Sequence, residues 1–121
     1  MTAPTPLHPD AVALLHTLDE SQPGSTAKLV RLFAADAPAL LSRIELGHAA
    51  GDLEQINQAA HFLRSSALAL GVTQLADAAF RLEHLEAAQL GSDVAELRVA
   101  QLRVSLRDAL LTLLDLAPDE S

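Results

Sequence analysis

The 121-residue chain contains no cysteine, tryptophan or tyrosine. Without cysteine it can form no disulfide, zinc–thiolate site or thiol nucleophile. Aromatic residues make up only 2% of the sequence, whereas hydrophobic residues make up 50%. A core must therefore be built from leucine, alanine, valine and isoleucine, and this set of side chains favours closely packed helices.

Basic residues are also few, because eight Lys and Arg stand against sixteen Asp and Glu, a formal net charge of −8. This negative charge repels nucleic acids and anionic lipids, so we expect neither as a partner. Residues 1–9 lack the basic and apolar regions of a signal peptide, and no apolar run approaches the ~20 residues of a membrane span. We therefore expect a soluble, cytoplasmic protein.

The hydrophobic spacing is helical throughout, and no stretch alternates as a β-strand does. It predicts a short helix from residue 9 to the break at 22–24, and four long helices over about 26–48, 53–70, 74–90 and 93–116. Pro38 should kink the second of these or split it near Asp36. The expected fold is all-α: an up-down antiparallel four-helix bundle (residues 9–117) with an additional short N-terminal helix. A flexible N-terminus (1–8) and an acidic tail (118–121) should flank it.

The common sequence signatures of catalysis and cofactor binding are missing. The chain has no Gly-rich phosphate loop, no HExxH pair, no G-x-S-x-G elbow and no series of carboxylates for a metal. We therefore predict neither a metal site nor a cofactor. Four of the five histidines are isolated, and we interpret them as surface or helix-end residues: His8, His16, His48 and His84.

His61 has different surroundings. In a helix over 53–70 the apolar stripe faces the bundle, which places His61 on the solvent side with Asn57, Gln58, Arg64 and Ser65 as neighbours. An exposed neutral imidazole titrates near ~6.5 and is a competent nucleophile at neutral pH. Arg64 could stabilise the oxygens of an attached phosphoryl group, and the small Ser65 leaves room for another protein to approach.

The run from His61 to Gly71, HFLRSSALALG, resembles the signature of histidine-containing phosphotransfer (HPt) domains, H-x-L-K-[GS]-S-S-x-x-L-G. The resemblance continues at Leu82-Glu83 and, upstream, at Gly51-Asp52. It covers roughly residues 26–90, and the last helix matches only in type. It implies a phosphorelay intermediate of two-component signalling, which accepts a phosphoryl group from, and passes it to, the aspartate of receiver domains.

Carried over position by position, the resemblance implies that His61 is the phosphoacceptor. Glu83 would accept the inner N–H of the imidazole and fix its orientation. Four further side chains would contact the phosphoryl group or the partner: Arg64, Ser65, Phe62 and Leu68. The resemblance also implies a protein without catalytic activity of its own, whose partners are response-regulator receiver domains and a hybrid or sensor histidine kinase. The receiver would supply the Mg²⁺, and we expect the chain to be a monomer.

Two other functions are compatible with the same residues. The run H-x-L-R-S also resembles the phosphoacceptor box of sensor histidine kinases, H-E-L-R-T-P, although Phe62 replaces the Glu and Ser66 the Pro. Such a fragment would need a second chain to complete its bundle, so a stable dimer would favour it. The other alternative is a helical adaptor that binds without phosphorylation. It is favoured by a second apolar row in the last helix: Leu97, Val104, Leu111 and Leu114.

Overall fold

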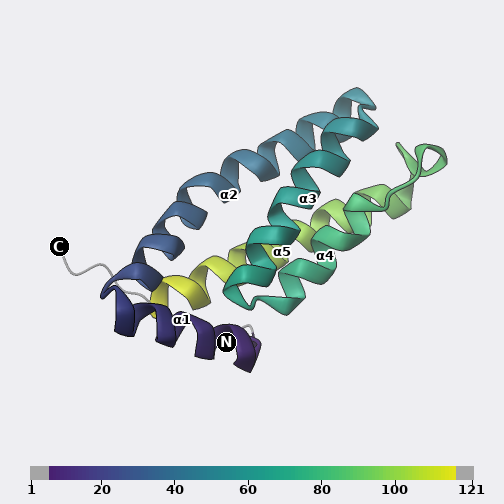
Figure 1. The fold of residues 1–121 in the computed structure, drawn as a ribbon. Helices are drawn as coiled ribbons and strands as arrows, with labels where there is room; N and C mark the ends of the chain where they lie inside the picture. Colours follow the sequence, from purple (N-terminus) through teal and green to yellow (C-terminus); the bar gives the residue numbers. More distant parts are fainter. Residues whose placement is uncertain (1–5, 117–121) are drawn as a thin grey trace.

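The computed structural model describes residues 6–116. Its elements are α1 (Pro9–Ser21), α2 (Ser25–Ala50), α3 (Leu53–Leu70), α4 (Thr73–Glu83), the 3₁₀ helix η1 (Ala87–Gln89) and α5 (Asp93–Leu116). The helices α2 to α5 form a bundle in which α3 and α5 each pack on both α2 and α4 (Figure 1). The helix α3 therefore lies diagonally opposite α5. The short α1 lies across one end and packs on α2 and α3. The predicted all-α helical bundle is confirmed.

The core is aliphatic, as the composition predicts. Its fully buried side chains come from each of the helices α2 to α5 and include Val30, Ile44, Ile56, Leu63, Leu75, Leu82, Leu102 and Leu113. Gly47 allows α2 to approach α3 closely, because a Cβ atom there would lie 3.0 Å from Ile56 Cγ1 and 3.1 Å from Asp52 O. None of the described helices is both long and apolar enough to cross a membrane.

The helix α2 continues through Pro38, so of the two predicted effects, a kink or a split near Asp36, the split does not occur. Pro38 removes one backbone donor, but it lies on the exposed side of the helix. Phe33, Ala37 and Ile44 are buried on the other side. Packing of this buried side on neighbouring helices holds α2 together despite the missing hydrogen bond.

The fourth helix is shorter than the predicted range of 74–90, because it ends at Glu83. The last bond of its helical ladder runs from His84 N to Phe80 O at 3.1 Å, and the next carbonyl, Arg81 O, accepts from Nη1 of Arg98 on α5 at 3.1 Å. Neither glycine nor proline lies between residues 84 and 90, so the sequence carries no local signal for this end.

Leu7 and His8, which the sequence analysis assigns to a flexible N-terminus, are bonded to the turn between α3 and α4. Leu7 forms an isolated antiparallel bridge with Val72, and His8 N donates to Gly71 O at 2.7 Å. His8 Nδ1 also accepts from Asp10 N at 3.1 Å and so caps α1. Residues 1–5 and the predicted acidic tail lie outside the described residues.

Candidate functional site

The candidate nucleophile lies midway along α3, on the outer side of the helix. Ala60 and Leu63 are fully buried, whereas 56% of the His61 side chain is exposed. The helix is fixed at its start by the carboxylate of Asp52, which accepts from Gln55 N at 3.1 Å. Because the face of a helical residue follows from its spacing, the burial of its neighbours places His61 outward, as predicted.

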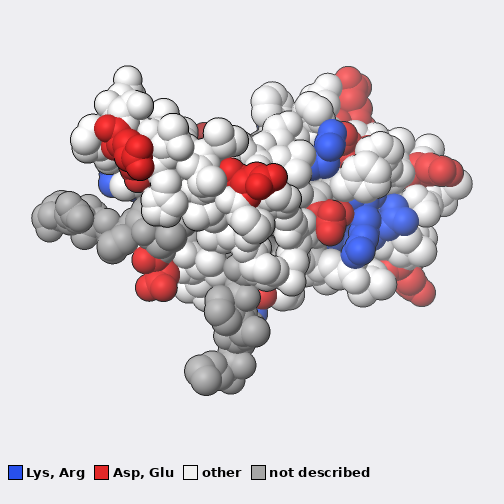
Figure 2. Space-filling model, turned by 60° about the horizontal axis from the view of Figure 1, so that its bottom comes forward, with Lys and Arg blue, Asp and Glu red and all other residues white. Residues whose placement is uncertain are grey.

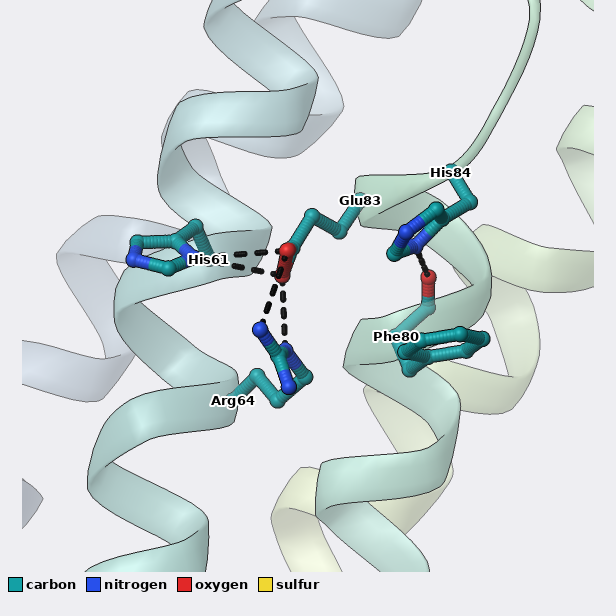
Figure 3. A network of polar contacts seen from close by, with 5 residues as sticks. All are labelled: His61, Arg64, Phe80, Glu83 and His84. Atoms are coloured by element: carbon teal, nitrogen blue, oxygen red, sulfur yellow. Dashed lines mark hydrogen bonds and ion pairs between the residues drawn. The ribbon is translucent and has the colours of Figure 1, made fainter.

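One ring nitrogen of His61 faces α4. Its Nδ1 lies 3.3 Å from each carboxylate oxygen of Glu83 (Figure 3). An ionised carboxylate can only accept a hydrogen bond, so Nδ1 carries the proton in this contact. The other nitrogen, Nε2, then keeps its lone pair and points away from Glu83 (Figure 3). This tautomer and orientation are those that a nucleophilic imidazole requires.

The same carboxylate also binds Arg64. Arg64 Nε donates to Glu83 Oε1 at 2.7 Å, and Nη2 donates to Oε2 at 3.2 Å. The guanidinium lies 5.8 Å from the centre of the Phe80 ring, within range of a cation–π contact. Arg64, expected beside His61 on the solvent side of α3, is only 30% exposed and pairs with Glu83. Glu83 lies on another helix, 19 residues along the chain, so no local pattern shows this pairing.

The environment keeps Glu83 ionised. The hydrogen bonds from Arg64 lower the pKa of the Glu83 carboxyl from its ordinary value of 4.5, and the contact with His61 acts in the same direction. Burial opposes them, since only 16% of the side chain is exposed. The resulting negative charge at neutral pH favours the Nδ1–H tautomer of His61. His61, Glu83 and Arg64 therefore form one charge-coupled cluster between α3 and α4.

Asn57, which the sequence indicates only as a neighbour of His61, supports this cluster through the backbone of α4. With its amide nitrogen turned toward α4, Asn57 donates to Leu82 O at 2.9 Å and to Glu83 O at 3.2 Å. These are the last two carbonyls of α4, so Asn57 caps the helix that carries Glu83. The one sign of this role in the sequence is an asparagine four residues before His61, on the same face of α3.

Two of the predicted apolar contact residues are exposed on α3. Phe62 is 58% exposed and Leu68 52% exposed, and the exposed Ser65 lies between them in sequence. Phe62 lines a groove of about 500 Å³ between α2 and α3, together with Leu32, Phe33, Leu40, Ser66 and Ala69. Leu68 is not among its lining residues, so the predicted contact residues divide between two sides of α3. The imidazole lies beside α4, and the groove begins on the α2 side.

The other histidines have different surroundings. His84 Nδ1 lies 3.0 Å from Phe80 O, and His48 Nδ1 is buried without a hydrogen-bond partner in the described structure. Within residues 6–116, no three His, Asp or Glu side chains gather as a metal site requires. On the face that Figure 2 shows, acidic and basic side chains are scattered among uncharged residues.

The comparison with protein families gives one match. A family model described as the Hpt domain matches residues 28–117. The match runs from the first turn of α2 through α5, so it includes the last helix, which the sequence resemblance matches only in type. Neither a search of curated proteins nor a search of solved structures gave a match.

Proposed function

Because the chain belongs to the Hpt domain family, we propose that His61 accepts a phosphoryl group from, and passes it to, the aspartate of receiver domains. Domains of this family are phosphotransfer modules of two-component signalling, not classical enzymes, and interact with receiver domains and histidine kinases. The observation that carries the assignment to His61 is its ring geometry. Nδ1 lies against the Glu83 carboxylate, and Nε2 points outward from α3.

The chemistry follows from this geometry. Nε2 attacks the phosphorus of the aspartyl phosphate, an N–P bond forms, the O–P bond breaks, and the aspartate leaves as a carboxylate. The imidazole gains positive charge as the bond forms. Glu83 stabilises that charge through the Nδ1–H hydrogen bond, so no proton has to move during the transfer. The reverse reaction uses the same groups, which suits an intermediate that both accepts and donates.

Arg64 acts in this proposal in two ways. Two of the five guanidinium N–H donors hold Glu83, and the remaining donors are available to the oxygens of the phosphoryl group. The Mg²⁺ that neutralises the transferring group belongs to the receiver domain, which also brings the phosphorylated aspartate. We propose no cofactor held by this chain.

The receiver would dock over α3. Phe62, next to His61, and Leu68, two turns further along α3, offer exposed apolar surface, and the groove beside Phe62 can take an apolar side chain of the partner. Ser65 is small and exposed, so it does not block the approach to the imidazole. The kinase-fragment alternative is less well supported, because α2 to α5 complete a four-helix bundle within one chain.

Labelling tests the site. Receiver domains are first phosphorylated with a small-molecule phosphodonor and Mg²⁺, and then mixed with the protein, with His61→Gln, or with His84→Gln as the matched control. We expect an acid-labile label on the unchanged protein and on His84→Gln, and none on His61→Gln. Equal labelling of His61→Gln would overturn the assignment.

A further inference from the structure

Phe80 is a half-exposed aromatic residue of α4, one turn before Glu83. The chain has three phenylalanines, of which Phe33 is buried in the core and Phe62 lines the groove between α2 and α3. Phe80 does neither, since it is 48% exposed and does not line that groove. Exposure of a single apolar side chain is common and does not by itself indicate a function. The contacts of the Phe80 ring are more informative.

The first of these contacts is with the cation of the candidate site. Phe80 and Glu83 are three residues apart in a helix, so both side chains lie on the face of α4 that meets α3. Glu83 binds Arg64 at 2.7 and 3.2 Å, and Cζ of Arg64 lies over the Phe80 ring, 5.8 Å from its centre. The helix α4 therefore meets one guanidinium with a carboxylate and an aromatic ring, one turn apart.

The second contact fixes the ring on its own helix. The imidazole of His84 packs against the Phe80 ring, with the ring centres 4.1 Å apart and the planes inclined by 33° (Figure 3). Nδ1 of His84 lies 3.0 Å from Phe80 O, and a carbonyl oxygen can only accept, so Nδ1 donates in this contact. The imidazole is thus folded back over the last turn of α4. Its packing limits the positions open to the Phe80 side chain.

Arg64 needs such a neighbour, because an ion pair alone holds a long side chain weakly. Forming the pair costs rotamer freedom, and water competes for the N–H groups of a side chain that is 30% exposed. An aromatic ring within about 6 Å attracts the cation and occupies space into which the side chain would otherwise turn. The ring therefore favours the position in which Arg64 binds Glu83, whose carboxylate lies 3.3 Å from Nδ1 of His61.

We propose that Phe80 is a positioning residue for phosphoryl transfer. Its ring keeps Arg64 on the Glu83 carboxylate, and Glu83 in turn keeps the imidazole of His61 oriented. Because the effect passes through Arg64, the ring matters only while that side chain is present. The role in transfer rests on the proposed function, whereas the hold of the ring on Arg64 does not.

Exchange of the Arg64 Nε–H proton with water, measured by NMR on the unphosphorylated protein, tests this hold without any transfer. The signal is identified by its absence from Arg64→Lys. Phe80→Leu keeps an apolar side chain but removes the ring, and should accelerate the exchange roughly twofold to fivefold. Phe80→Tyr keeps the ring and should exchange as the unchanged protein does. Leu114→Ala is the matched control, since Leu114 lies on α5 and is 45% exposed.

Transfer rates at rising concentrations of a phosphorylated receiver domain test the role in the reaction. Phe80→Leu should lower the maximum rate roughly twofold to fivefold and leave the half-saturating concentration unchanged, and Phe80→Tyr should restore the rate. In the Arg64→Ala background the loss of the ring should have no further effect. An unchanged maximum rate, or an undiminished effect without Arg64, would overturn the proposal. A rise confined to the half-saturating concentration would make Phe80 a docking residue and would also overturn it.

The two measurements distinguish failure of this proposal from failure of the proposed function. If His61 takes no label while Phe80→Leu accelerates the exchange, the proposed function is wrong and the hold of Phe80 on Arg64 is confirmed. If His61 takes the label equally fast with and without the ring, the proposed function is confirmed and the positioning role is wrong. Circular dichroism of each variant checks that the bundle is intact.

Discussion

The guanidinium of Arg64 and the carboxylate of Glu83 form a two-point contact between α3 and α4, with donor–acceptor distances of 2.7 and 3.2 Å. The same carboxylate lies 3.3 Å from Nδ1 of His61. One acidic side chain thus holds both the cation and the imidazole. A substitution at Arg64 should therefore alter the position of Glu83 and, through it, the orientation of the His61 ring, in addition to its direct effect.

Glu83→Gln should lower the free energy of unfolding by about 1 kcal/mol at pH 7, because a neutral amide cannot form the same charge-assisted contacts. The pKa of Glu83 in the folded protein lies below its ordinary value of 4.5. Folding therefore favours the ionised form, and this contribution is complete at neutral pH and is lost as the pH falls through and below 4.5.

Thermal unfolding followed by circular dichroism checks this pH dependence. The difference in Tm between the protein and Glu83→Gln should be present at neutral pH and shrink below about pH 4.5. The pKa of Asp19 is also lowered, chiefly by the hydrogen bond from Thr26 N, but Asp19 is present in both proteins and cancels in the comparison. A difference that persists unchanged at pH 3 would contradict the role given to the Glu83 charge.

Arg64→Ala should slow transfer to His61 by roughly fivefold to a hundredfold, which corresponds to about 1–3 kcal/mol. Arg64→Lys should recover only part of this rate, because one ammonium group cannot reproduce the planar two-point contact with Glu83. Rates of transfer from a phosphorylated receiver domain measure both effects. If Arg64 acts partly through Glu83, its effect and that of Glu83→Gln will be non-additive in the double variant. Strict additivity would show that the two side chains act independently.

Asn57→Ala should destabilise the protein by about 1–2 kcal/mol, because Glu83 O loses its donor and Leu82 O keeps only backbone donors. Amide hydrogen exchange should accelerate in the last turn of α4. Gln58→Ala is the matched control, since the Gln58 side chain is exposed and donates to Glu54 of the same helix at 3.1 Å. Its effect should stay within about 0.5 kcal/mol. Equal changes in the free energy of unfolding for Asn57→Ala and Gln58→Ala would show that Asn57 does not cap α4.

Gly71→Ala should be more destabilising than Gly91→Ala. Both glycines have positive φ, at +78° and +75°, so both variants bear a backbone cost of about 1–2 kcal/mol. A Cβ at Gly71 would also lie 2.8 Å from Ala11 Cβ, whereas one at Gly91 meets nothing within 4 Å. The contact should add about 1–3 kcal/mol and displace α1. Urea unfolding of both variants measures the difference. Equal midpoints would show that α1 can move away from residue 71 without a loss of stability.

Local pattern was enough to predict the helices and the outward face of α3. Apolar spacing and the stops at Gly51 and Gly71 define α3 within the sequence, and the same spacing turns His61 away from the buried Ala60 and Leu63. It also shows the second apolar row of α5. Each of these features depends on residues within a few turns of one helix, where 3.6 residues per turn fix the direction of every side chain.

Other features were decided only by packing between helices. The end of α4 at Glu83 depends on donors from Asn57 on α3 and Arg98 on α5. The pairing of Glu83 with Arg64 depends on how α3 and α4 face each other, and α2 continues past Pro38 because its other side is buried. A sequence fixes which face a side chain takes on its own helix. What that face meets depends on the rotation and offset of a neighbouring helix, and those follow from packing of the whole core.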